Sequence, residues 1–217
     1  MQWVQYLGAD FLFFGASQAS GVSTSIQGML SLEDVWTLAG FLILLLGALT
    51  FRYDRDSGVA KSVYSLPYSN DEIFGIKLIS LLIYGFLMLL LPFAYVAITT
   101  YASIAGYLPE ITSRFLSDAL LLVAFLVLYL IAVATLVSLA SPPNAFLAFM
   151  AGFAVIYAPK ILGNSSMPPA LFINALHLCG STDFNVFKAA YLEWGGIVVP
   201  IVIFLLSWVL IRRRDVV

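Results

Sequence analysis

The chain has 217 residues, of which 62% are hydrophobic and only 10% are charged. Soluble domains carry about 45–50% apolar and about 25% charged residues, so this composition predicts an integral membrane protein. The net charge of −2 argues against the clustered basic surface that nucleic-acid binding requires, and the single cysteine excludes a disulfide within the chain.

Residues 1–34 precede the first long apolar run. Their first 15 residues are apolar but include Asp10, whereas a membrane span needs about 20 apolar residues. We therefore expect residues 1–34 to form an external or interfacial segment, since aromatic side chains such as Trp3 and Tyr6 suit the headgroup level. A sixth, N-terminal span is the alternative.

Five apolar runs follow and predict an all-α fold, a polytopic membrane protein with five transmembrane helices in one domain over residues 1–217. We expect these helices at 35–51, from 78 onwards, and at 119–140, 144–159 and 194–211. The second run stays uncharged as far as Pro109, so it should bend or leave the hydrocarbon at Pro92 or within 101–107. A turn at 141–144 should join the third and fourth helices, and residues 160–193 should form an external loop.

Basic residues predict the orientation. Four of them lie in the loop over 53–76 or at its edges, and Arg212, Arg213 and Arg214 follow the last span. Five crossings place these seven on one side and leave three, at 114, 160 and 188, on the other. The positive-inside rule therefore predicts a plasma-membrane protein with a cytoplasmic loop, a cytoplasmic C-terminus and an external N-terminus.

The loop over 53–76 is the most polar part of the chain, because residues 52–77 hold eight of its 22 charges. Ser69 and Glu72 have the spacing of a capping box, which predicts a helix that starts near Asn70 and continues into the second span. Apolar residues at 59, 63 and 66 predict a short helix over 53–66, ended by Pro67. The loop should thus be a surface helix joined to two spans.

This segment resembles the type-2 ATP-binding-cassette (ABC) permeases, the membrane subunits of ABC exporters. The matching features are an acidic residue at Asp54 or Asp56, Gly58, the pair Leu66-Pro67, polar residues at 69–70, and Lys77 at the start of the next span, followed much later by the Arg-rich tail. The resemblance covers residues 35–217. The family usually has Glu where Asp stands here, and six spans where five are predicted. The missing span is supplied by residues 1–16, supplied by another chain, or absent.

The resemblance implies that the helix over 53–66 docks on a cytosolic ABC ATPase subunit. That partner would bind ATP and Mg²⁺, so this chain would hold no cofactor and catalyse no reaction; it contains no G-x-x-x-x-G-K-[ST] motif. The other implied partners are a second permease chain, identical or related, and the lipid bilayer. The implied coupling residues are Asp54, Arg55, Asp56, Gly58, Lys61, Tyr64, Leu66 and Pro67.

Other interpretations stay open. The charged loop could act only as a solvated topology determinant, and the chain could be a non-transporting membrane anchor or assembly subunit of a larger complex. An integral membrane enzyme is disfavoured, because no cluster of His, Asp, Glu and Cys converges in the sequence.

Three smaller groups of residues have alternatives of their own. Asp118 and Glu193 lie at span starts, where a helix cap explains them better than a proton relay. A metal site at His177, Cys179 and Asp183 is less favoured than a packed loop. Glycines at 40, 47 and 152 predict close helix packing, within the chain or between chains.

Overall fold

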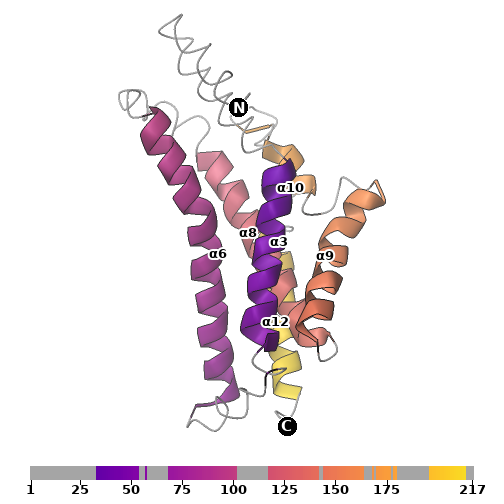
Figure 1. Ribbon diagram of the computed structural model, residues 1–217. Coiled ribbons are helices and arrows are strands. Elements are labelled where there is room, and N and C mark those ends of the chain that lie inside the picture. Colours follow the sequence, from indigo (N-terminus) through magenta and orange to yellow (C-terminus); the bar gives the residue numbers. More distant parts are fainter. Residues whose placement is uncertain are drawn as a thin grey trace, which may run out of the picture.

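The computed structural model describes residues 33–53, 57, 68–101, 117–141, 144–163, 168, 170–176, 178–179 and 196–213. Every regular element in these ranges is helical, which confirms the predicted all-α class. The elements are α3 (Glu33–Ala48), the π-helical turn η2 (Leu49–Tyr53), α6 (Asn70–Tyr101), α8 (Ser117–Ala140), α9 (Ala145–Ile161), α10 (Ala170–Leu176) and α12 (Val199–Arg213). The long helices lie side by side and run alternately up and down one bundle (Figure 1).

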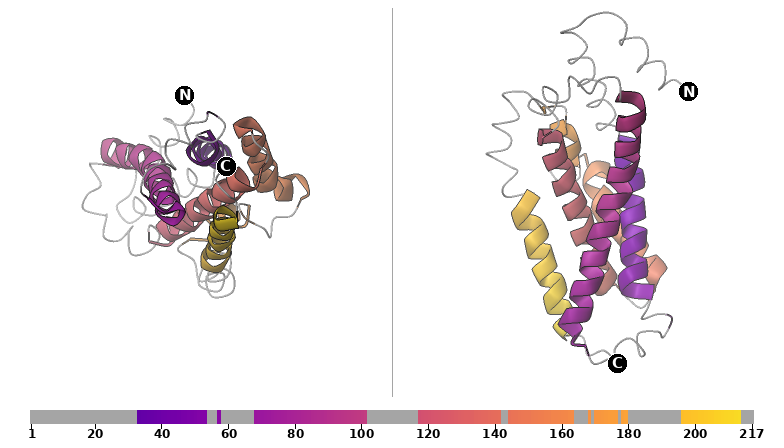
Figure 2. Two further views of the ribbon diagram at one scale, coloured as in Figure 1. Left: turned by 90° about the horizontal axis from the view of Figure 1, so that it is seen from below. Right: turned by 90° about the vertical axis from the view of Figure 1, so that its left-hand side faces the viewer.

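Helix α8 is the centre of the bundle. Helices α3, α6, α9, α10 and α12 all pack against it, as the views along and across the bundle show (Figure 2). Its sequence is apolar all round, so it has no polar face to turn towards water. Leu126, Leu130 and Ile131 are each at most 1% exposed. Burial of these side chains among the other helices accounts for the position of α8.

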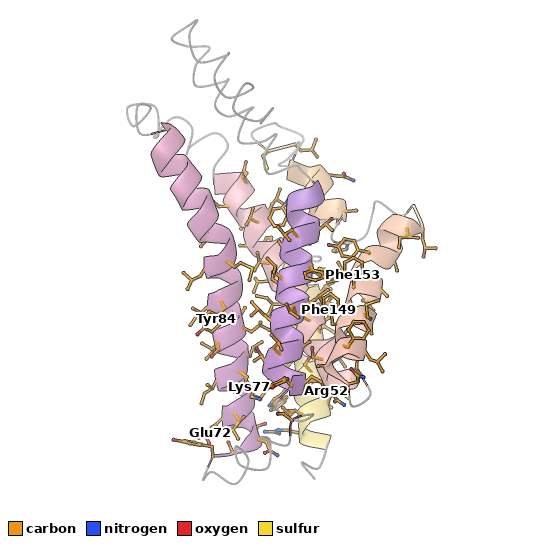
Figure 3. All side chains as sticks on the ribbon, viewed as in Figure 1. Arg52, Glu72, Lys77, Tyr84, Phe149 and Phe153 are labelled. Atoms are coloured by element: carbon orange, nitrogen blue, oxygen red, sulfur yellow. The ribbon has the colours of Figure 1, made fainter. Side chains whose placement is uncertain are left out.

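Helices α3 and α9 approach each other closely through glycine. A Cβ atom added at Gly152 of α9 would lie 2.5 Å from Cδ2 of Leu44 in α3. The hydroxyl of Tyr157 donates to the carbonyl oxygen of Thr37 at 3.2 Å. Phe149 and Phe153 point from α9 towards α3 (Figure 3), and the Phe149 ring meets Phe41 edge to face at 4.9 Å. The close packing expected at Gly152 is therefore a contact within the chain.

Helix α10 was not predicted, because residues 160–193 were expected to form a loop. Its seven residues follow Pro169, a residue type that suits the first positions of a helix. Phe172 and Ala175 are at most 1% exposed, and they lie three residues apart on one face of the helix. The helix forms because this short apolar face packs against α8.

The sequence left two places at which the second predicted span could bend or leave the hydrocarbon, Pro92 and the region 101–107. Helix α6 continues past Pro92 and ends at Tyr101, inside the other region where we expected a bend or an exit. Proline removes one helical hydrogen bond. The hydrogen bonds that remain on either side of Pro92 are enough to continue the helix.

Within the part of the chain that the structure describes, two segments are long and apolar enough to cross a membrane, namely Trp36–Tyr53 and Asp118–Ala140. Two shorter apolar helices cover Ala145–Ala158 and Gly196–Arg212. The predictions for residues 1–32 lie outside the described residues, as does most of the predicted external loop over 160–193.

Candidate functional site: the charged end of the bundle

The eight predicted coupling residues, Asp54, Arg55, Asp56, Gly58, Lys61, Tyr64, Leu66 and Pro67, all lie outside the described residues. The structure instead describes the two places where this segment joins the bundle. On one side α3 ends in η2, and the Ser57 amide donates to the Tyr53 carbonyl at 2.9 Å. On the other side Tyr68 and Ser69 lead into α6. The site is therefore built from these two junctions.

The start of α6 is a capping box, as the sequence predicts. The Ser69 hydroxyl accepts from the Glu72 amide at 3.2 Å, and the Ser69 amide donates to Glu72 Oε2 at 2.8 Å. The Ser69 hydroxyl also donates to Glu72 Oε2 at 3.0 Å, and the hydrogen bonds that the Ser69 amide and hydroxyl donate to this carboxyl lower its pKa below the ordinary value of 4.5. We call residues 54–67 the connecting segment. Helix α6 thus has a defined first turn shortly after this segment.

Asp71, in the same turn, binds two side chains of α12. Trp208 Nε1 donates to Asp71 Oδ1 at 3.0 Å, and Arg212 Nε donates to the same oxygen at 3.1 Å. Arg212 Nη2 donates to Asp71 Oδ2, which makes the ion pair bidentate. Arg212 Cζ also lies 4.0 Å from the centre of the Trp208 ring, in cation–π geometry. We call these three side chains the Asp71 clamp.

The clamp lowers the pKa of the Asp71 carboxyl below its ordinary value of 3.8. The hydrogen bonds from Arg212 are the largest cause, and the charge of Arg212 and the Trp208 hydrogen bond act in the same direction. Partial desolvation of the carboxyl opposes them. Asp71 is therefore ionised, and the clamp intact, at neutral pH.

The first junction also touches α6. The rings of Phe51 in η2 and Phe74 in α6 have centroids 5.8 Å apart, and both side chains are buried. Arg52, next to Phe51, is only 3% exposed. It lies at the same end of the bundle as Glu72 and Lys77 (Figure 3). The two ends of the connecting segment are thus held together in space.

Cys179, one of the three residues considered for metal binding, lies beside α10 at the opposite end of the bundle. Cys179 is buried and its thiol donates weakly to the Ala175 carbonyl at 3.8 Å. Burial, with a smaller effect of Asp118, raises the pKa of Cys179 to about 12. His177 and Asp183 lie outside the described residues. Cys179 therefore has the environment of a packed, neutral thiol.

Sequence reasoning missed the partners of Asp71. Trp208 and Arg212 lie four residues apart and share one face of α12, which is a readable local signal. Their contact with a carboxylate 137 and 141 residues earlier along the chain has no such signal. The Arg-rich tail was interpreted only as a topology and family feature.

Comparison of the chain with protein-family models, with curated proteins and with solved structures finds no match.

Proposed function

We propose that this protein is the multi-pass membrane subunit of an ATP-driven exporter of the type-2 ABC permease kind. It would pair with a second permease chain and with cytosolic ATPase subunits that bind ATP and Mg²⁺. The segment over 53–66 would dock on the ATPase. The chain itself would carry out no chemistry.

The distribution of apolar surface supports a place in the bilayer. Large apolar side chains are exposed on the outer helices, including Ile79 and Ile83 of α6 and Ile201 and Leu205 of α12, each more than 50% exposed. In water, an apolar surface of this extent would promote aggregation. Helix α8 has 22 residues without a charge from Ala119 to Ala140, about 33 Å of helix, close to the hydrocarbon thickness of about 30 Å.

We extend this proposal to five crossings by α3, α6, α8, α9 and α12. The uncharged part of α6 begins at Leu78 and is long enough for one crossing. Helices α9 and α12 are shorter, and a bilayer accommodates such spans by local thinning. The alternating direction of the five helices supports this topology (Figure 1). The end that carries Arg52, Lys77 and Arg212 would face the cytoplasm under the positive-inside rule.

The observation that carries the coupling role is the way the connecting segment is anchored. Its first junction contacts α6 through Phe51 and Phe74. Its second junction is the capped first turn of α6, and that turn is bonded to α12 through Asp71. A force on residues 54–67 would therefore reach α3, α6 and α12 directly. A simple solvated loop would not need such anchoring.

The first experiment is to isolate the tagged protein from its native membrane in mild detergent and to identify bound proteins by mass spectrometry. We expect a cytosolic ATPase subunit and a second permease chain. Gly58→Glu and Leu66→Glu should release the ATPase and abolish export while the protein still inserts. Leu162→Glu is the matched control, since residue 162 is 81% exposed at the opposite end of the bundle.

Two outcomes would contradict the proposal. Full export by both segment variants would show that the loop has no coupling role. Absence of any ATPase, under conditions in which other membrane complexes stay whole, would favour the membrane anchor or assembly subunit instead.

A further inference from the structure

In the Asp71 clamp, both oxygens of an exposed carboxylate accept two hydrogen bonds each. Oδ1 accepts from Trp208 and Arg212, and Oδ2 accepts two donors from the same guanidinium. The side chains of Arg212 and Asp71 remain 55% and 40% exposed. The hydrogen bonds therefore fix the relative orientation of the three side chains, although Asp71 and Arg212 stay partly exposed to solvent.

Stability does not explain this arrangement. Exposed ion pairs contribute little to folding, because solvent screens them and two long side chains must be ordered. Helix α12 has other means of attachment, since it packs along α8 and buries Ser207 and Ile211. The clamp is thus not needed to keep α12 in the bundle. What it adds is a fixed relation between the end of α12 and the start of α6.

The Asp71 clamp lies close to both ends of the connecting segment. Asp71 lies two residues after Ser69, where the connecting segment enters the capping box. Phe74 follows Asp71 by three residues, almost one helical turn, and contacts Phe51 at the other end of the same segment. The first turn of α6 is consequently held from both sides, by η2 and by α12. If the first turn of α6 is displaced, either α12 moves with it or the hydrogen bonds of the clamp break.

We propose that the Asp71 clamp is the joint through which movement of the connecting segment reaches α12. This inference rests on the coupling function proposed above. Asp71 acts as a positioning residue that makes the start of α6 and the end of α12 move as one body. Because α12 packs on the central helix α8, the movement would continue from there into the middle of the bundle.

The test compares two carboxylates in the first turns of two helices. Asp71→Asn keeps an acceptor for Trp208 but removes the charge that binds Arg212. Asp118→Asn is the matched control, since it makes the same change in the first turn of α8, at the opposite end of the bundle. Arg212→Lys keeps the charge but loses the bidentate geometry. The double variant Asp71→Arg/Arg212→Asp restores an ion pair with reversed polarity.

Two readouts are needed on the complete complex in sealed lipid vesicles, because export is measured between two separate compartments. Spin labels at Tyr68 and Val209, both exposed, report the distance between the α6 start and the end of α12. Export per ATP hydrolysed reports coupling. Asp71→Asn and Arg212→Lys should broaden the distance distribution and lower export per ATP by about fivefold or more, the lower range of allosteric coupling. Asp118→Asn should change neither, and the double variant should recover both.

The outcomes separate this inference from the function on which it rests. A wild-type complex that shows no ATP-driven export overturns the proposed function, and the joint with it, whatever the spin labels report. If the wild type exports and Asp71→Asn exports equally well per ATP, only the joint is overturned. An equal loss in Asp71→Asn and Asp118→Asn also overturns it, because the effect then belongs to loss of any carboxylate at a helix start.

Discussion

Gly47 of α3 lies directly against Ala134 of α8. A Cβ atom added at Gly47 would stand 2.8 Å from the Cβ of Ala134 and 3.4 Å from its carbonyl carbon. Neither atom belongs to a flexible side chain. A side chain at position 47 could therefore be accommodated only if the backbones of α3 and α8 moved apart. The close packing that the sequence predicted at Gly47 is thus realised within the chain, at the contact between α3 and the central helix.

This contact predicts a loss of stability in Gly47→Ala. Overpacking a tight core costs about 1–3 kcal/mol, which denaturant titration of the purified protein would measure as a lower free energy of unfolding. The swap Gly47→Ala/Ala134→Gly should recover part of the loss. Gly75→Ala is the control: nothing lies within 4 Å of the added atom, and alanine favours a helix by about 1 kcal/mol over glycine. An equal response at both glycines would refute the close contact.

The cap of α9 gives a second prediction. Asn144 Oδ1 accepts from the amides of Phe146 and Leu147 at 2.8 and 3.3 Å. Asn144→Ala should lower the free energy of unfolding by about 1 kcal/mol and increase amide exchange at the first turn of α9. Asn144→Asp keeps the acceptor and should retain wild-type behaviour. Comparable exchange in all three proteins would mean that the cap is not formed.

The Asp71 clamp should open at low pH. Its carboxyl has a pKa below 3.8 when the clamp is closed and the ordinary value of 3.8 when it is open. Ionisation of the Asp71 carboxyl therefore stabilises the closed clamp fully above pH 3.8. This stabilisation is lost as the pH falls through the lower pKa that the carboxyl has in the closed clamp. The distance between spin labels at Tyr68 and Val209 should be constant between about pH 5 and 8 and broaden only below 3.8.

The control for this titration is Asp71→Asn. Its distance distribution should be broad at every pH, because the group that titrates is absent. If the wild-type distribution is as narrow at pH values well below 3.8 as at neutral pH, the carboxylate does not hold the clamp closed.

Cys179 should resist thiol reagents in the folded protein. With a pKa of about 12, only about one thiol in 10⁴ is ionised at pH 8, against about one in ten at the ordinary value of 9.0. A maleimide should modify an introduced Leu162→Cys, at an 81% exposed position, long before it modifies Cys179. Unfolding in detergent should remove the difference. Rapid labelling of native Cys179 would contradict the packed environment described for it.

Local features of the fold could be predicted from the sequence. Ser69 and Glu72 interact over three residues, so their spacing alone predicted the start of α6. Helix α8 was expected at 119–140 and runs over Ser117–Ala140, because an uncharged run between polar residues has few alternatives. Helix α10 was missed, since seven residues are too few to show a period and its burial depends on α8.

Longer-range features could not be predicted. Nothing near Asp71 in the sequence indicates that its partners are Trp208 and Arg212, because that contact depends on how α6 and α12 pack around α8. The second span shows how a local rule leaves alternatives open. The sequence predicted a bend or an exit at Pro92 or within 101–107, and helix α6 runs past Pro92 and ends at Tyr101.

The length of chain between the two halves of the Asp71 clamp has a consequence for biosynthesis. Arg212 is made 141 residues after Asp71, and ribosomes add about 5–20 residues per second, so roughly 7 to 28 s separate the two. During this interval the first turn of α6 carries an ionised carboxylate without its guanidinium. The start of α6 cannot be joined to α12 until that helix has been made. A nascent chain that stops earlier would therefore leave the first turn of α6 held by η2 alone.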